Sequence, residues 1–148
     1  MKRIFYNEQA CTGCGLCEVY CLVEHSKTKN ILKAYKRENP KPVARIRLEV
    51  NRPLTYVARC QHCKDPACVA VCLSGAMRKD DRTGIVVHDA EKCVGCWTCI
   101  MVCPFGALVR DTSTRRVVIK CDLCSESEIP ACVSNCPSDA LVYKESGF

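Results

Sequence analysis

The chain of 148 residues has few of the side chains that build an ordinary hydrophobic core. Aromatic residues make up 6% of it, and they include three Phe and one Trp. A chain of this length that buries little apolar surface needs a further source of stability, and bound metal is a common one. The composition therefore argues against a fold held together by side-chain packing alone.

Long apolar runs are also missing. No stretch approaches the ~18 apolar residues that a membrane span needs. The first ten residues, MKRIFYNEQA, contain no apolar segment of the kind found in a secretory signal, although a partner chain could carry one. We therefore expect a cytoplasmic location and no direct membrane span. In such a reducing compartment, clustered cysteines are metal ligands more often than disulfides.

Catalytic constellations are missing as well. The chain has no evident Ser/His/Asp set, no paired carboxylates and no flavin or nucleotide motif, so we expect no catalytic residue. Its three histidines do not change this view. His25 and His88 are isolated, so that a surface or hydrogen-bonding role fits them better than ligation, and His62 stands between two cysteines of a group that is already complete.

What the chain does have is sixteen cysteines in four groups of four. Each group opens with C-x2-C and closes with C-x3-C. The middle spacing is two residues in groups one and three, four in group two and seven in group four. The repetition indicates an internal duplication. The groups are, in order, Cys11, Cys14, Cys17 and Cys21; Cys60, Cys63, Cys68 and Cys72; Cys93, Cys96, Cys99 and Cys103; and Cys121, Cys124, Cys132 and Cys136.

The spacing is that of iron–sulfur ligands. Group three, CVGCWTCIMVCP, matches the run C-x2-C-x2-C-x3-C-P of bacterial ferredoxins, and group four ends in Cys136-Pro137. In that run three cysteines bind one cluster and the fourth binds a second one. Gly13, Gly15 and Gly95 would let the loops take positive φ angles. Structural zinc sites pair two C-x2-C units across a longer loop, and disulfides would be strained at such crowding. We expect four [4Fe–4S] clusters, with all sixteen cysteines as metal ligands.

The net charge of +6 counts every cysteine as neutral. A four-iron cluster with four thiolates carries about −2, so four clusters would bring the loaded protein to about −2 as well. The basic residues are then counter-charge for the clusters, and we expect no nucleic-acid partner.

The four cysteine groups must be assigned to pairs, because the fourth cysteine of each group is expected to ligate the cluster of a second group. Sequential pairing would join group one with two and three with four, whereas nested pairing would join two with three and one with four. Groups two and three are separated by 20 residues and groups one and two by 38. The shorter gap favours nesting.

Short elements are expected between the groups. Alternating or apolar runs predict strands at 45–50, 85–87, 117–119 and 141–143, with turns at 81–84 and 111–114. The C-x3-C halves, such as residues 99–103, predict short helices. The basic, proline-containing insertion at 22–59 is either a solvated connector with one hairpin or a docking surface for an acidic partner.

Over its whole length the chain resembles the four-cluster ferredoxin-type subunits of molybdenum and tungsten oxidoreductases. The resemblance implies an α+β fold of two nested ferredoxin-like modules, with short strands, short helices and long cluster-binding loops. Groups two and three would form the module at 60–103, and groups one and four the module at 1–59 and 104–148. Leu22 and Leu73 depart from the family where a proline often follows the fourth cysteine. The implied ligand sets are Cys11, Cys14 and Cys17 with Cys136; Cys121, Cys124 and Cys132 with Cys21; Cys60, Cys63 and Cys68 with Cys103; and Cys93, Cys96 and Cys99 with Cys72.

Three segments, CEVYCLVEHSK, CVGCWTCIMVCPFGA and CDLC…IPACVSNCPSDALVY, resemble the small iron–sulfur protein family that serves nickel carbon monoxide dehydrogenase. This implies an electron-transfer subunit, not an enzyme, between that donor and a hydrogenase or a flavin-dependent NAD(P) oxidoreductase. The alternative is the polyferredoxin subunit of a tungsten aldehyde oxidoreductase or of a formate-linked hydrogenase complex. A protein of another class, a zinc-stapled interaction module, has only the C-x2-C pairs and the basic charge in its favour.

Overall fold

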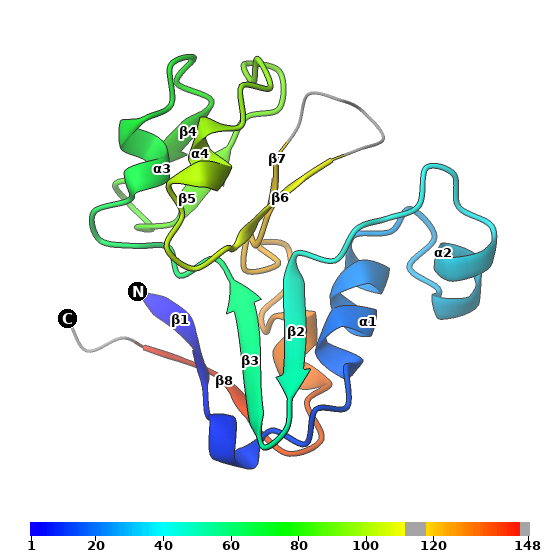
Figure 1. The fold of residues 1–148 in the computed structure, drawn as a ribbon. Coiled ribbons are helices and arrows are strands. Elements are labelled where there is room, and N and C mark those ends of the chain that lie inside the picture. Colours follow the sequence, from blue (N-terminus) through cyan, green and yellow to red (C-terminus); the bar gives the residue numbers. More distant parts are fainter. Residues whose placement is uncertain (112–117, 146–148) are drawn as a thin grey trace. The chain divides into compact units, whose positions relative to one another are not determined.

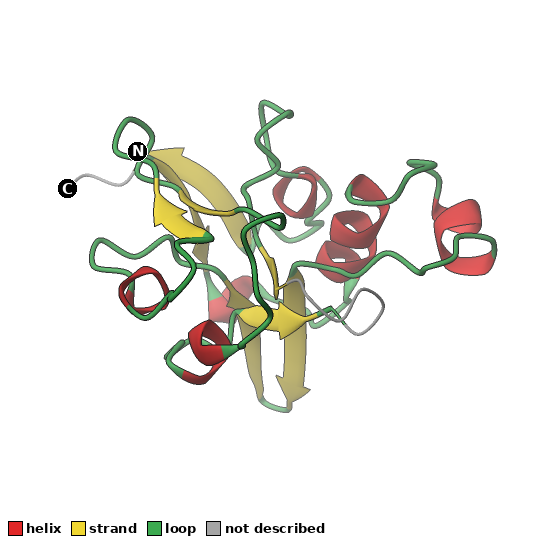
Figure 2. Ribbon diagram, turned by 90° about the horizontal axis from the view of Figure 1, so that it is seen from above, coloured by secondary structure: helices red, strands yellow, loops and turns green. Residues whose placement is uncertain are grey.

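The cysteine loops are joined by short helices and two-stranded ribbons, not by one large sheet. The computed structural model describes residues 1–111 and 118–145. The chain forms two compact units, one of residues 1–58 and 123–148 and the other of residues 59–122. Figures 1 and 2 show the short elements separated by long loops. This arrangement confirms the predicted α+β class.

In the first unit the two ends of the chain pair with each other. Strand β1 (Lys2–Tyr6) runs antiparallel to β8 (Leu141–Glu145), and Figure 1 shows them side by side. The other elements of this unit are η1 (Glu8–Ala10), α1 (Leu16–Glu24), α2 (Ile31–Lys36), the hairpin of β2 (Ile46–Asn51) and β3 (Leu54–Arg59), whose last residue begins the second unit, and α5 (Ala131–Ser134).

The second unit holds two further ribbons. One pairs β4 (Met77–Lys79) with β5 (Val86–His88), and the other pairs β6 (Leu108–Arg110) with β7 (Val118–Lys120). Two one-turn helices, α3 (Ala67–Ala70) and α4 (Thr98–Met101), complete it. Its small core consists of Met77, Val86, Cys99 and Leu108.

The β1–β8 ribbon repeats the β4–β5 ribbon in its register. In β1–β8, Tyr6 lies opposite Leu141, and in β4–β5, His88 lies opposite Met77. Leu141 and Met77 each follow the last cysteine of their group by five residues. Tyr6 and His88 each precede the first cysteine of theirs by five. The chain ends thus form the same ribbon that a hairpin forms in the second unit.

The same correspondence extends to a hydrogen bond beside each ribbon. The N–H of Asn7 donates to the carbonyl of Ala140 at 2.8 Å, and the N–H of Asp89 donates to the carbonyl of Ala76 at 2.8 Å. Both alanines are buried. The internal duplication inferred from the cysteines therefore has a counterpart in the backbone.

Most of the expected elements are present within two residues of their predicted bounds. Strands β2, β5 and β8, helix α4 and the turn before Gly84 correspond to the expectations at 45–50, 85–87, 141–143, 99–103 and 81–84. Strand β7 corresponds to the expectation at 117–119, although residue 117 and most of the turn at 111–114 lie outside the described residues.

The insertion contains the expected hairpin, β2–β3, and a helix that the sequence did not lead us to expect. Helix α2 begins after Asn30, whose side chain accepts the N–H of Lys33 at 3.1 Å. Strand β1 was not expected either. Within the described part of the chain, no helix is long and apolar enough to span a bilayer.

The two faces of β1 give a test of the fold. Ile4 is 2% exposed and its neighbour Phe5 is 39% exposed. Ile4→Ala should lower the free energy of unfolding of the cluster-loaded protein by about 2–4 kcal/mol, because it leaves a cavity in the first unit. Anaerobic denaturant unfolding followed by circular dichroism measures this. Phe5→Ala is the matched control and should cost clearly less; equal losses would contradict the assigned faces.

Candidate metal centres

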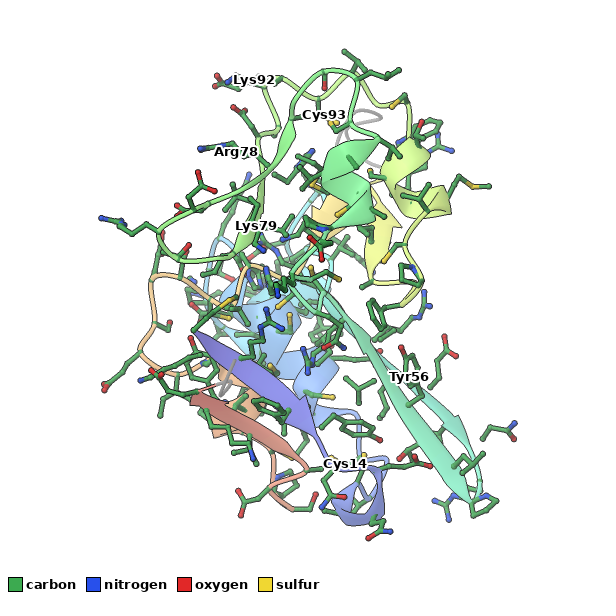
Figure 3. All side chains as sticks on the ribbon, turned by 90° about the vertical axis from the view of Figure 1, so that its left-hand side faces the viewer. Cys14, Tyr56, Arg78, Lys79, Lys92 and Cys93 are labelled. Carbon is green, nitrogen blue, oxygen red and sulfur yellow. The ribbon has the colours of Figure 1, made fainter. Side chains whose placement is uncertain are left out.

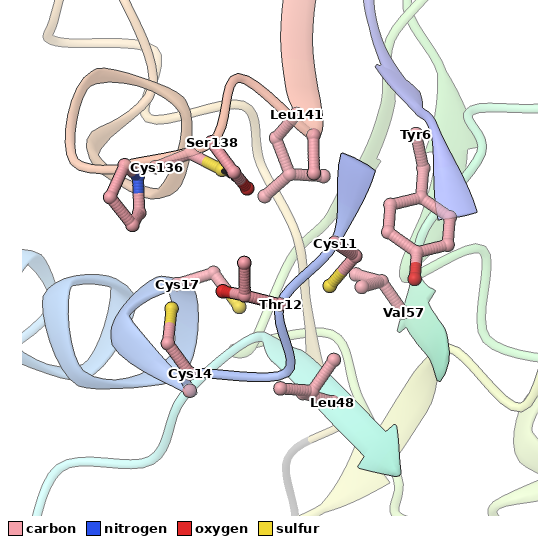
Figure 4. Close-up of a pocket in the computed structure, with 13 residues that line it drawn as sticks. Tyr6, Cys11, Thr12, Cys14, Cys17, Leu48, Val57, Cys136, Ser138 and Leu141 are labelled. Atoms are coloured by element: carbon pink, nitrogen blue, oxygen red, sulfur yellow. Dashed lines mark hydrogen bonds between the residues drawn. The ribbon is translucent and has the colours of Figure 1, made fainter. Parts of the chain in front are cut away.

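One cavity of the first unit gathers cysteines from both ends of the chain. It has a volume of about 310 Å³ and is lined by Cys11, Cys14, Cys17 and Cys136. Figure 4 shows these side chains around it. Cys11 and Cys14 lie in the loop between η1 and α1, Cys17 lies in the first turn of α1, and Cys136 follows α5. These are the four residues that the nested arrangement assigns to one cluster.

Two cavities of the second unit are lined in the same way. Their volumes, about 320 and 340 Å³, are close to that of the first cavity. Each takes three cysteines from one group and the last cysteine of the other. One is lined by Cys93, Cys96 and Cys99 with Cys72, and the other by Cys60, Cys63 and Cys68 with Cys103.

The fourth predicted set is buried. In the first unit Cys21 lies in α1 and Cys132 in α5, two helices that pack together, and Cys124 is buried as well. The N–H of Arg45 donates to Cys21 Sγ at 3.2 Å. Cys121 is buried and belongs to the second unit. The joint assignment of this set stays a prediction.

All four loops share one backbone feature. The residue directly before the second cysteine has a positive φ angle in each group: Gly13 (72°), His62 (46°), Gly95 (72°) and Leu123 (62°). This conformation costs an L-residue about 1–2 kcal/mol, yet histidine and leucine adopt it here. The sequence pointed only to the glycines. Left-handed turns of this kind direct backbone N–H groups toward an anion, which suits a negatively charged cluster.

Hydrogen bonds favour the thiolate form of two of the fourth cysteines. Burial raises the pKa of Cys72, but hydrogen bonds outweigh it and hold the pKa below the usual value; the N–H of Met77 donates to Cys72 Sγ at 3.3 Å. The pKa of Cys136 is lowered in the same way, with burial opposed by the N–H groups of Leu141 and Ser138. The thiolate is the form that binds metal.

Two other cysteines have the opposite tendency. Burial, reinforced by neighbouring cysteines, raises the pKa of Cys17 and of Cys99 to about 11. Metal binding must displace these protons, so that ligation at these positions releases protons and is favoured by higher pH.

Two buried donors fit a sulfur-rich group in the cavity of Cys72, Cys93, Cys96 and Cys99. Trp97 Nε1 and His88 Nε2 are buried, and neither has a hydrogen-bond partner within residues 1–111 and 118–145. Both residues line this cavity. A buried N–H without an acceptor is costly, and an anionic cluster would offer sulfur acceptors. The residues present therefore fit a [4Fe–4S] cluster.

A buried cation lies near another cavity. Lys120 is 5% exposed, and its ammonium donates to the carbonyls of Val86 and Cys121. Its positive charge opposes the burial that raises the pKa of Cys68. A buried ammonium needs a compensating negative charge, and a cluster held by Cys68 would provide it. Sequence reasoning did not single out Lys120, because nothing local distinguishes it from the exposed lysines.

His62 is a structural residue that the sequence left undefined. It is almost fully buried, and its Nδ1 accepts the N–H of Val86 at 3.1 Å. This acceptor role accounts for a histidine inside a C-x2-C pair. His25 likewise has a local role, since its Nδ1 donates to the carbonyl of Cys21 at 2.7 Å.

The comparison with known families decides the identity of these centres. The model of the 4Fe-4S dicluster domain matches residues 54–146. The chain belongs to this family. Its cofactors are accordingly [4Fe–4S] clusters, and sixteen cysteines provide ligands for four of them.

Two curated relatives show how members of this family are used. The thiosulfate reductase electron transfer subunit PhsB of Salmonella typhi is 32% identical over 155 aligned residues, which cover 95% of this chain and 73% of that protein. The putative oxidoreductase AegA of Escherichia coli is 33% identical over 147 residues. The match covers 95% of this chain, which spans only 21% of AegA.

A solved structure agrees on the fold. The active-site complex BamBC of benzoyl coenzyme A reductase contains a chain with a TM-score of 0.53 and 24% identity, which covers 97% of this chain and 76% of that one. At this identity the likeness concerns the fold alone.

The buried Lys120 gives a test of the centre beside it. Lys120→Met should lower the stability of the loaded protein by about 1–3 kcal/mol, because two buried carbonyls lose their donor and the centre loses a counter-charge. Anaerobic unfolding followed by cluster absorbance measures the loss. Lys92→Met, at an exposed position, is the matched control and should change little. Equal stability of both variants would contradict the role of Lys120.

Proposed function

We propose that this chain relays single electrons between redox partners through four [4Fe–4S] clusters and catalyses no reaction by itself. The observation that carries the proposal is the lining of three cavities by four cysteines each. A cluster with thiolate at every iron has no open position for a substrate and exchanges one electron at a time. The protein then supplies burial, hydrogen bonds and counter-charge. The electron donor and the acceptor are other polypeptides or domains.

We propose the nested ligand sets as well, with modules at 60–103 and at 1–59 plus 104–148. The β1–β8 ribbon supports them, because it places the strand after group four beside the strand before group one. The four sets are Cys11, Cys14, Cys17 and Cys136; Cys121, Cys124, Cys132 and Cys21; Cys60, Cys63, Cys68 and Cys103; and Cys93, Cys96, Cys99 and Cys72.

As donor we propose carbon monoxide dehydrogenase, with a hydrogenase or a flavin-dependent NAD(P) oxidoreductase as acceptor, in an anaerobic cytoplasm. The three segments that resemble the iron–sulfur protein of that enzyme support this choice. A second candidate is the electron-transfer subunit of a tungsten aldehyde oxidoreductase or of another reductase complex. The similarity to PhsB, a thiosulfate reductase electron transfer subunit, supports the wider class of reductase complexes.

One face of the second unit suits the approach of a partner. Cys96 is exposed, which brings its cavity to the surface. Arg78 and Lys92 are exposed, and Figure 3 shows them with Lys79 in the same unit as Cys93. A partner with an acidic contact surface would be steered to such a region at low salt.

The electron-transfer function has a direct test. Anaerobically purified protein should be brown, contain about sixteen irons per chain and bleach with dithionite. Carbon monoxide dehydrogenase with CO should reduce it in stopped-flow absorbance, and a molybdenum or tungsten reductase complex that co-purifies with the chain instead would favour the second candidate. Colourless protein that contains zinc would overturn the electron-transfer proposal.

The nested ligand sets predict a particular match between variants. Cys136→Ser and Cys14→Ser should alter the same signal in electron paramagnetic resonance (EPR) spectra of the reduced protein, because both residues line one cavity. The double variant should alter no second signal. Cys96→Ser is the control for sequential pairing: if Cys136→Ser matched Cys96→Ser instead, nesting would be wrong.

A further inference from the structure

Trp97 stands inside a cluster-binding loop with its polar atom turned inward. It follows Cys96 with a φ angle of 55° and precedes helix α4. The guanidinium carbon of Arg110 lies 3.8 Å from the centre of its ring, and the ring packs against the core around Met77. These contacts hold the indole in place, and its Nε1 is buried without a hydrogen-bond partner in the described part of the chain.

His88 reaches the same cavity from a different element. It ends strand β5 opposite Met77, whose N–H donates to Cys72 Sγ. Its Nε2 is also buried and, among the residues described, has no hydrogen-bond partner. Two donors from separate parts of the second unit therefore face one cavity, which is lined by His88, Trp97 and the four cysteines Cys72, Cys93, Cys96 and Cys99.

The corresponding cavity of the first unit lacks this pair. In the internal duplication, Gly15 occupies the position that corresponds to Trp97, and Tyr6 the position that corresponds to His88. Gly15 has no side chain, and the hydroxyl of Tyr6 shares a hydrogen bond of 2.6 Å with the hydroxyl of Thr55. The two N–H groups are thus a feature of one centre, not a requirement of the loop.

The cost of burial defines what should accept these protons. A buried N–H group without an acceptor lowers the stability of the folded protein by about 1–3 kcal/mol, and here two such groups line one cavity. The other groups with acceptor capacity in that lining are mainly cysteine sulfurs, and a cluster adds its sulfides. His88 can donate this hydrogen bond as a neutral imidazole. Burial, followed by the positive charge of Lys120, lowers its pKa and so favours the neutral form. A sulfur acceptor opposite Nε2 then favours the tautomer that carries its single proton there.

We propose that Trp97 Nε1–H and His88 Nε2–H donate hydrogen bonds to the sulfur atoms of the cluster held by Cys72, Cys93, Cys96 and Cys99, and that they raise its reduction potential. The proposal rests on the ligand set proposed above. Reduction adds negative charge to the cluster, and hydrogen bonds to its sulfurs stabilise the more negative state. Neither residue is a ligand; both would adjust the reduction potential of one cluster through hydrogen bonds.

The single tryptophan of the chain makes the first test specific. Protein with its iron–sulfur clusters bound is prepared with ¹⁵N in the indole of its one tryptophan and is then partly reduced. Pulsed EPR should then detect a ¹⁵N coupling on one cluster signal, the same signal that Cys96→Ser alters. Absence of the coupling in protein with four intact clusters would overturn the inference and leave the proposed function standing. Iron content too low for four clusters would overturn the proposed ligand sets and the inference with them.

The second test measures the potential itself. Trp97→Phe keeps an aromatic ring near Arg110 and removes the indole N–H, and His88→Phe removes the imidazole donor. Each should shift the midpoint potential of one cluster to a more negative value in an EPR-monitored redox titration, and the double variant should shift it further. Tyr56→Phe, at an exposed tyrosine, is the control and should leave all four potentials unchanged.

A variant potential equal to that of the unmodified protein, with unchanged iron content, would overturn the tuning role. If a phenylalanine variant does not bind its clusters, the ¹⁵N measurement on the unmodified protein still tests whether Trp97 donates a hydrogen bond to the cluster.

Discussion

The bond between cysteine thiolate and iron is the interaction on which this structure depends. Of the five α-helices in the described part of the chain, four lie next to or within a cysteine group. Three of these, α3, α4 and α5, are four residues long. Every sheet is two-stranded among the residues described, and an isolated two-stranded ribbon is marginal in water. The core of the second unit is correspondingly small. The free energy of cluster ligation therefore contributes directly to the stability of the folded chain.

The second constraint is the duplication, and it has an unusual consequence for the chain ends. The ribbon that a hairpin forms between groups two and three is formed between groups four and one by strands from opposite termini. A cavity lined by Cys11 and Cys136 follows directly from that pairing. The ribbons would account for the proposed nested order, because each one places the last cysteine of one group near the first three of another.

Inside this repeated frame the surroundings of the centres differ. Trp97 and His88 line one cavity, and Gly15 and Tyr6 take their places in another. Lys120 places a buried charge near Cys68. Identical ligand sets can therefore have unequal potentials, because potential depends on hydrogen bonds, charge and solvent exposure around the sulfurs. Such differences would set the driving force of each transfer step, whereas the overall direction of flow depends on the donor and the acceptor.

The sequence by itself determined the cofactor, the α+β class and most of the short elements. Cysteine spacing is a local code: C-x2-C fixes which sulfurs can reach one metal, and strand periodicity is read within a few residues. The spacing also favoured the nested order, but only through the lengths of two gaps. Helix α2 and strands β1, β4 and β6 escaped prediction. Strand β1 depends on a partner at the other end of the chain, which no local pattern reveals.

Only the tertiary structure decided what surrounds the sulfurs. His62 and Leu123 adopt a left-handed conformation that their residue types disfavour, so that their residue types alone did not predict it. Trp97 and His88 are separated by eight residues, and only the folding of β5 and α4 brings their donors to the same cavity. The physical reason is that ligand spacing acts along the chain, whereas burial and hydrogen bonding depend on groups that meet through space.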